Sequence, residues 1–207
     1  MVGATALGIG SGFIASLLGL GWVSAAVVVA LIFAYLLAYI ALTRDAFIGR
    51  LLLFGVVAGF LELLADWWLV DATRTLVYSP GPLILRSPLY MPFAWAGVIV
   101  PLAYWGHWGA QRARLSTVVI GIAILGAVYI PMYEQFAFGA GWWQYERTPM
   151  LSHAPAYIIL AELFIAAPLP WIALQLARRA WPQAILFGLG QGLWICAACA
   201  AAYLLLG

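Results

Sequence analysis

The sequence predicts an all-α membrane protein, a polytopic bundle of about seven transmembrane helices in a single domain of residues 1–207. The composition is the first observation: hydrophobic residues make up 67% of the chain and charged residues 8%, with a mean hydropathy of +1.06. A soluble domain is about half apolar and about a quarter charged. The second observation is that the apolar residues form runs of about 20 residues, the length that crosses a bilayer. The third is that Arg, Pro and Gly bound these runs.

The apolar runs place the expected spans in order along the chain. The first, about residues 3–18, is rich in glycine and short, so an interfacial or tilted helix is the alternative there. Six longer runs follow, at about residues 22–43, 48–70, 88–108, 115–137, 154–178 and 182–205. We expect no cleavable signal peptide, because no basic segment precedes the apolar residues of the amino terminus.

The arginines predict the orientation of the bundle. All nine basic residues are Arg, and six of them fall in loops on one side: Arg44, Arg50, Arg112, Arg114, Arg178 and Arg179. The other side has Arg74, Arg86 and Arg147. Cytoplasmic loops carry the excess of basic residues. We therefore expect a multi-pass protein of a bacterial or archaeal plasma membrane, with a cytoplasmic amino terminus and the longer loops, about 71–87 and 138–153, outside.

An internal repeat is visible when the sequence is aligned with itself at an offset of 67 residues, without gaps. The matched pairs are Gly59 and Gly126, Tyr78 and Tyr145, Pro82 and Pro149, Pro88 and Pro155, Tyr90 and Tyr157, Ala94 and Ala161, Pro101 and Pro168, Leu102 and Leu169, Ala110 and Ala177, and Arg112 and Arg179. The units are helix-loop-helix segments at about 45–112 and 113–179. Each contains two spans, so both have the same orientation, as in parallel-repeat membrane proteins. We expect a site between them.

Four acidic residues are the candidate catalytic groups. Glu62, Asp66, Glu134 and Glu162 fall inside the expected spans, where an ionisable residue costs about 2.5 to 3.5 kcal/mol and is therefore a candidate for function. Glu62 and Glu162 each lie about 12 Å below the outer end of their span, at 1.5 Å per residue. Asp66 lies one turn above Glu62 on the same helix face, which predicts a group of carboxyl groups in the outer half of the bundle.

Aromatic residues accompany these acids and are the candidate substrate-binding residues. They are Trp67, Trp68, Tyr90, Trp95, Tyr129, Trp142, Trp143 and Tyr157. The alternative is that the paired tryptophans are interface anchors, since Trp and Tyr gather at both membrane surfaces. Trp95 lies below the interface, at the level of Glu162, and fits that alternative less well. Of two neighbouring carboxyl groups, one can hold a proton while the other acts as a base. Aromatic faces stabilise a cation between them.

Other chemistries are disfavoured by particular absences and positions. The chain has no lysine, which excludes a retinal Schiff base, and its scattered arginines do not form the basic face of a nucleic-acid-binding protein. His107 and His153 are expected on opposite sides of the membrane, so we expect no shared metal site. Cys196 and Cys199 lie within an apolar run, where we expect packing residues rather than a redox pair. No cofactor is expected.

Four segments carry a resemblance to a known group of proteins. They are ELLADWW at 62–68, SPLYMPFAW at 87–95, EQFAFGAGWWQY at 134–145 and HAPAYIILAEL at 153–163. Their pattern resembles the small integral-membrane isoprenoid enzymes: the heterodimeric or fused-type lycopene cyclases, the carotenoid hydratases and the membrane-bound terpene cyclases. The resemblance implies six or seven helices, no cofactor, and an acid/base role for Glu62, Asp66, Glu134 and Glu162. The Pro-x-Glu-Glu or Pro-x-Glu-Asp signature of lycopene cyclases is missing, with PMYEQ at 131–135 the nearest segment, which argues against lycopene cyclisation itself.

These observations favour a membrane-embedded enzyme of the isomerase or lyase type. Its expected reaction is the proton-initiated cyclisation, isomerisation or hydration of an isoprenoid lipid, as in carotenoid biosynthesis. The expected partners are a lipophilic, isoprenoid-like small molecule and membrane lipid, and a homo-oligomer is compatible with the sequence. One alternative is a small proton-coupled transporter or the substrate-binding membrane subunit of one. Another is an assembly subunit whose acids pair with arginines of a partner.

Overall fold

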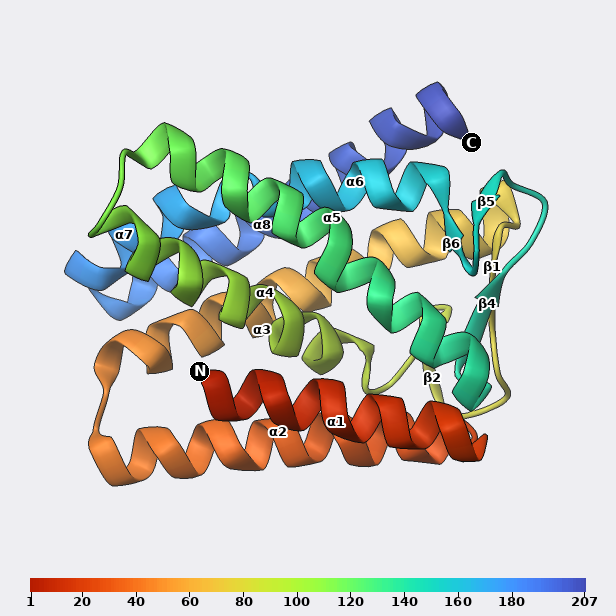
Figure 1. The fold of residues 1–207 in the computed structure, drawn as a ribbon, viewed down its shortest axis with the longest axis horizontal. Coiled ribbons are helices and arrows are strands. Elements are labelled where there is room, and N and C mark those ends of the chain that lie inside the picture. The colour runs from red at the N-terminus through yellow and green to blue at the C-terminus, as the bar shows by residue number, and fades with distance from the viewer.

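The computed structural model describes residues 1–207, the whole sequence, as eight α-helices with one π-helical turn (Figure 1). The helices are α1 (Val2–Leu18), α2 (Trp22–Thr43), α3 (Ala46–Trp67), α4 (Met91–Ala110), α5 (Leu115–Ala140), α6 (Ala156–Ala166), α7 (Leu169–Arg178) and α8 (Trp181–Leu206). The π-helical turn η1 (Trp68–Thr73) continues α3. Five segments are long and apolar enough to cross a membrane: α2, α3 with η1, α5, α6 with α7, and α8. These five indicate an integral membrane protein.

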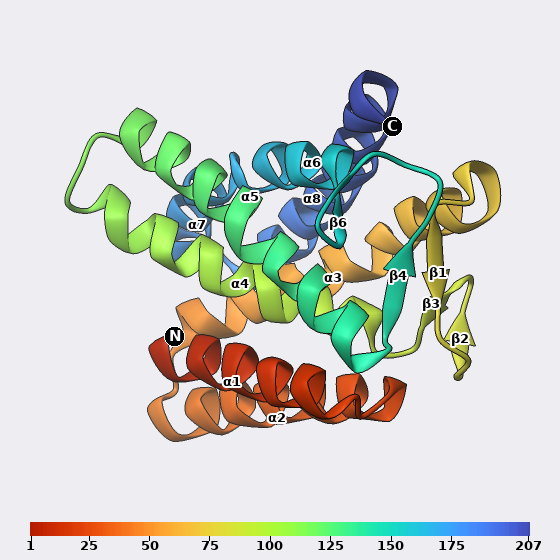
Figure 2. The same ribbon diagram turned by 45° about the vertical axis from the view of Figure 1, so that its right-hand side comes forward.

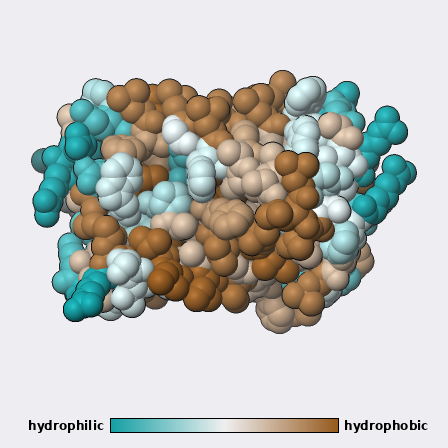
Figure 3. Space-filling view, turned by 90° about the horizontal axis from the view of Figure 1, so that it is seen from above, coloured by the Kyte–Doolittle hydropathy of each residue, from teal (hydrophilic) through white to brown (hydrophobic).

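The helices run along the long axis of the molecule, and their connections gather at its two ends. The short turns α2–α3, α4–α5 and α7–α8 lie at one end, and the longer loops with the strands lie at the other (Figure 1). Helices α1 and α2 form an antiparallel pair at one side of the bundle, which is clearest in Figure 2. In the space-filling view, hydrophobic residues form a broad band and hydrophilic residues gather at both ends (Figure 3). This distribution is the one that a bilayer requires.

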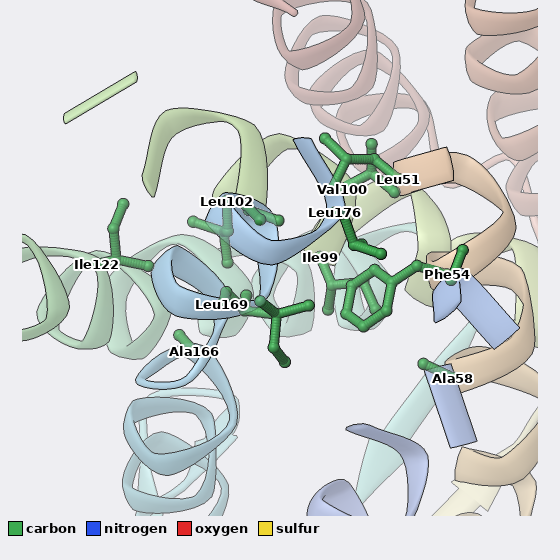
Figure 4. Close-up of a cluster of buried hydrophobic side chains, with 14 of the residues drawn as sticks. Leu51, Phe54, Ala58, Ile99, Val100, Leu102, Ile122, Ala166, Leu169 and Leu176 are labelled. Atoms are coloured by element: carbon green, nitrogen blue, oxygen red, sulfur yellow. The ribbon is translucent and has the colours of Figure 1, made fainter. Parts of the chain in front are cut away.

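The largest of three hydrophobic clusters fills the half of the bundle that contains the short turns. Leu51 and Phe54 of α3, Ile99 and Leu102 of α4, and Leu176 of α7 are among its buried residues (Figure 4). Glycines allow the helices to approach closely, because an added Cβ would contact the neighbouring helix. A Cβ added to Gly188 on α8 would lie 2.8 Å from the carbonyl oxygen of Phe54 on α3. Gly192, one turn along α8, meets α3 in the same way. Small residues four apart are the usual basis of close helix packing in membranes.

Helix α3, which carries two of the acidic residues, has well-defined ends. Asp45 caps its amino terminus by accepting hydrogen bonds from the backbone N–H groups of Phe47 and Ile48, at 3.0 and 3.1 Å. At its other end the helix widens into η1, which ends at Arg74 with a φ of 56°. Such a widened turn is frequently found at functional sites. It leads the chain directly into the loops that cover this end of the bundle.

Three short two-stranded ladders build these loops, and the sequence did not predict them. Strand β1 (Leu76–Tyr78) pairs antiparallel with β4 (Trp143–Tyr145), with Tyr78 opposite Trp143. Strand β2 (Leu83–Ile84) pairs with β3 (Ser87–Pro88), and β5 (Met150–Leu151) pairs with β6 (Ala154–Pro155). The β1–β4 ladder joins the two long loops, as Figure 2 shows.

Proline positions account for one further difference from the predicted spans. The expected span at 154–178 contains two helices, α6 and α7, because the chain is interrupted around Pro168. Proline has no backbone N–H and its ring clashes with the preceding turn. Pro101 and Pro131, in contrast, lie inside the continuous helices α4 and α5.

Candidate functional site

A cavity of about 100 Å³ lies among α2–α6, in the half of the bundle that contains the strands. It is lined by 24 residues, of which 19 are hydrophobic. The four predicted acids all line it: Glu62 and Asp66 from α3, Glu134 from α5 and Glu162 from α6. None of these four side chains is more than 7% exposed. The structure thus brings together in one small, mostly apolar space the residues that the sequence distributes over three helices.

Asp66 has the most hydrogen bonds of the four acids. Its Oδ2 accepts one from the hydroxyl of Tyr78 on β1 and one from the hydroxyl of Ser87 on β3, the latter at 2.7 Å. Burial raises the pKa of the Tyr78 phenol well above its ordinary value, and the nearby Asp66 carboxylate raises it further. Tyr78 therefore stays protonated and serves as a donor. Donors of this kind stabilise an ionised carboxylate.

Glu62 has a different environment, although it lies one turn from Asp66. Its Oε2 is buried and has no hydrogen-bond partner in the protein. Residues four apart on a helix lie on the same face, so the two carboxyl groups are neighbours. A buried carboxyl group without a donor favours its neutral form, whereas donors such as those around Asp66 favour the carboxylate. The two neighbours are therefore suited to act as an acid and a base.

Glu134 and Glu162 also differ in whether a hydrogen-bond donor of the protein reaches them. The indole N–H of Trp143 donates a hydrogen bond to Oε2 of Glu134. Oε2 of Glu162 is buried and has no partner in the protein, and neither has the hydroxyl of Tyr90. Buried polar atoms are nearly always hydrogen-bonded, because leaving one without a partner costs about 1 to 3 kcal/mol. The Glu162 carboxyl group and the Tyr90 hydroxyl are therefore available to a ligand in the cavity.

Half of the predicted aromatic residues line the cavity. Tyr90 directly precedes α4 and Trp95 lies on it. Trp142 directly precedes β4, and Trp143 lies on β4. Trp142 is held in place because its indole N–H donates to Ser24 of α2 at 2.8 Å. Aromatic faces thus surround the carboxyl groups on several sides.

The other four predicted aromatic residues do not line the cavity. Trp67 is 48% exposed on the outer surface, and Trp68 packs edge-on against a tyrosine of α8. Tyr129 is hydrogen-bonded with the next tyrosine of α5 at 3.2 Å. Tyr157 is fully buried, and its hydroxyl is hydrogen-bonded with that of Thr75 at 2.9 Å. These four anchor the protein in the bilayer or fill its interior.

The cavity also has lining residues that the sequence did not single out as site residues. They include Tyr78, Tyr133, Tyr145 and Cys199. Tyr78 and Tyr145 lie in the loops, and the ladder that aims them inward joins segments 67 residues apart in the sequence. The sequence did contain one signal for Tyr78 and Tyr145 as site residues, because the internal repeat aligns them with each other.

The arrangement can hold and transfer protons in a largely apolar space. It combines four buried carboxyl groups with several aromatic faces. No group of three or more His, Cys, Asp or Glu side chains is placed to hold a metal ion. The two histidines lie elsewhere: His153 stacks on Phe138, and His107 is hydrogen-bonded with Gln111 at 2.8 Å.

The fold and the cavity define a helical integral membrane protein with a buried group of carboxyl side chains. Residues 63–206 match the model of a family described as a domain of unknown function (DUF6989). The match spans well over half of the chain, so the protein belongs to this family. The matched part includes Asp66, Glu134 and Glu162 and begins directly after Glu62. Comparison with curated proteins gave no match, and neither did comparison with solved structures.

Proposed function

We propose that the protein is a membrane-embedded enzyme that uses its buried carboxyl groups for the proton-initiated cyclisation, isomerisation or hydration of an isoprenoid lipid. The observation that carries the proposal is that Glu62 and Asp66, one helix turn apart, line the same aromatic cavity and differ in their hydrogen-bond donors. In this proposal Glu62, which has no donor at Oε2, holds the proton, and two hydroxyl donors hold Asp66 as a carboxylate. An acid and a base side by side are what this type of reaction requires.

The reaction starts with Glu62. Its proton is transferred to a carbon of a C=C bond, whose π electrons form the new C–H bond, or to the oxygen of an epoxide, whose C–O bond breaks. A carbocation remains. In cyclisation, the π electrons of a second C=C bond of the same molecule first form a new C–C bond to the cation, which closes the ring and leaves a new cation. In cyclisation and in isomerisation, a C–H bond next to the cation then gives its electrons to a new C=C bond and its proton to Asp66. In hydration, water adds to the cation and loses a proton to Asp66. Proton transfer from Asp66 to the neighbouring Glu62 then restores the pair.

The other residues of the cavity stabilise the cation and shape the site. The faces of Trp95, Trp142 and Trp143 attract a positive charge, which is worth about 2 kcal/mol or more when water is excluded. Glu134 of α5 and Glu162 of α6 supply further negative charge or hydrogen bonds within the cavity. The substrate is an isoprenoid lipid that comes from the membrane. The proposed reaction uses no cofactor.

Two finer features of the fold belong to this proposal: seven membrane crossings and an internal duplication of residues 45–112 and 113–179. The 17-residue α1 and the 20-residue α4 would complete the seven, and the six arginines of the short turns favour a cytoplasmic amino terminus.

Strands β4, β5 and β6 each begin 67 residues after β1, β2 and β3. A parallel duplication would relate the two hairpins by an axis along the membrane normal and place the cavity between them.

Proton-coupled transport is the second function that these acids would suit. Transport needs a path for the solute from the cavity to the other face of the membrane. The half of the bundle below the cavity is a packed core that includes Phe54, Ile99 and Leu102 (Figure 4). This packing favours an enzyme that receives its substrate from one leaflet.

The test is turnover of linear isoprenoid alkenes, alcohols and epoxides by the purified protein in lipid vesicles. Glu62→Gln and Asp66→Asn keep the side-chain shape and remove the acid and the base, so we expect each to lower the rate about 10²- to 10⁴-fold. Glu146→Gln, which changes an exposed loop carboxylate, is the matched control and keeps the activity. Thermal unfolding shows whether each variant is folded. Full activity in both cavity variants would refute the proposal, and a pH-driven solute flux that needs Glu62 would favour the transporter.

A further inference from the structure

A second hollow lies on the outside of the bundle, next to the cavity. It is an apolar groove of about 500 Å³ between α2, the β2–β3 hairpin and the start of α4. Its lining residues include Trp22, Ala26, Ala30 and Phe33 of α2, with Pro82 and Leu89 on either side of the hairpin. Ala26 and Ala30 are four residues apart and so share one helix face. Their small side chains leave the space between the larger aromatic ones.

The groove and the cavity share part of their walls. Val29, Tyr90 and Phe93 line both. The ring of Phe93 lies edge-on to that of Phe33 in the groove, with ring centroids 5.3 Å apart. The hydroxyl of Tyr90 is buried without a partner in the protein. These three side chains form a wall that the outer groove shares with the space that holds the carboxyl groups.

The dimensions and position of the groove suit a lipid chain. Between Trp22 and Phe33 it follows α2 for about 16 Å, at a rise of 1.5 Å per residue. One leaflet contributes half of the hydrocarbon core of about 30 Å, so the groove is as long as one leaflet is deep. Only 22% of the most apolar stretch of α2 is buried inside the protein, so this helix faces lipid. The groove lies in the same half of the bundle as the acids.

We propose that this groove binds the hydrocarbon chain of an isoprenoid alcohol or epoxide from the surrounding leaflet, and that its reactive end passes Val29, Tyr90 and Phe93 to reach the acids. The inference rests on the proposed function and names how its substrate is held. The chain lies against Ala26, Ala30 and the aromatic side chains. The Tyr90 hydroxyl donates a hydrogen bond to the oxygen of the substrate as it passes.

The experiment uses a farnesol analogue with a photoreactive diazirine, added to the full-length protein in phosphatidylcholine vesicles. Mass spectrometry then locates the label. We expect labelling within residues 22–33 and at the start of α4. In Ala30→Trp the indole fills the groove, and we expect about tenfold less labelling, equivalent to about 1.4 kcal/mol. Ala38→Trp, an exposed alanine of the same helix, is the matched control and labels as the wild type does.

Competition decides which lipid the groove takes. Unlabelled geranylgeraniol should compete with the probe, and palmitic acid should not. Equal competition by both would identify a general lipid-binding surface and overturn the proposal, as would labelling spread evenly over the lipid-facing helices or unchanged labelling in Ala30→Trp. Glu62→Gln keeps the groove intact, so its labelling should equal that of the wild type. Specific labelling with no turnover in any form of the protein would support the lipid-binding groove and refute the proposed enzymatic function.

Discussion

Gly59 is the position where the packing next to the site can be tested most directly. It lies on α3, three residues before Glu62, and is buried. A Cβ added there would overlap the carbonyl oxygen of Pro92, a backbone atom in the first turn of α4 that cannot rotate away. Gly121 on α5 is the matched control, since a Cβ added there meets nothing within 4 Å. The same substitution, Gly→Ala, is therefore predicted to have opposite effects at the two positions.

The magnitudes follow from two opposing contributions. Overpacking a well-packed site costs about 1 to 3 kcal/mol, whereas Ala is more favourable than Gly in a helix by about 0.5 to 1 kcal/mol. We expect Gly59→Ala to lower the free energy of unfolding by about 1 to 2 kcal/mol and Gly121→Ala to raise it by about 0.5 to 1 kcal/mol. For a chain of this size, 1 kcal/mol moves the Tm by about 2 to 4 °C.

Thermal unfolding of the purified protein in detergent, followed by circular dichroism, measures both variants. We expect a lower Tm for Gly59→Ala and an equal or higher Tm for Gly121→Ala. The displaced α4 also carries Trp95, so Gly59→Ala should lower any turnover more than its loss of stability explains. A Gly59→Ala protein as stable as Gly121→Ala would refute the close approach of α3 and α4.

Three further substitutions test local interactions. Asp45→Ala removes the cap of α3, and we expect it to lower the free energy of unfolding by about 1 kcal/mol in a denaturant titration. Ser87→Ala removes a buried hydrogen bond to the Asp66 carboxylate, which is worth about 1.5 to 3 kcal/mol, so both the Tm and the turnover should fall. Arg86→Ala breaks an ion pair with Asp71 whose side chains are 54% and 36% exposed, so we expect a change of less than about 1 kcal/mol in the same titration.

Each of these predictions can fail in a distinct way. Asp45→Asn is the control for the cap, because asparagine also caps helices well, and equal loss in both variants would contradict the cap. Ser87→Thr keeps the hydroxyl and should restore what Ser87→Ala loses, whereas no rescue would mean that size and not hydrogen bonding matters. A loss of several kcal/mol in Arg86→Ala would show that the pair has a role beyond the exposed surface.

The helices were predictable because hydropathy and chain breakers set their limits. The run at 22–43 coincides with α2, and that at 115–137 begins where α5 begins. The run at 48–70 differs more: α3 starts two residues earlier, and its end continues in the π-helical η1. Hydropathy does not distinguish one helix type from another. Prolines were an inconsistent guide, since the chain is interrupted around Pro168 whereas Pro101 lies inside the continuous helix α4.

The acids of the candidate site were predictable for a different reason. Carboxyl groups are rare at membrane depth, so position alone singled out Glu62, Asp66, Glu134 and Glu162. Their hydrogen-bond donors were not predictable. Ser87 donates from a strand, and Trp143 from another strand opposite Tyr78. The pairing of β4 with β1 depends on how two distant loops meet, which no local pattern of the sequence encodes.

The ladder between β1 and β4 connects two of the acids mechanically. Tyr78 and Trp143 face each other across it, and each donates to a carboxyl group on a separate helix, Asp66 on α3 and Glu134 on α5. A movement that parts the two strands would withdraw both donors at once. Two acids on different helices are thus linked through the pairing of two short strands, so a molecule that parted these strands would change the hydrogen bonding of both acids together.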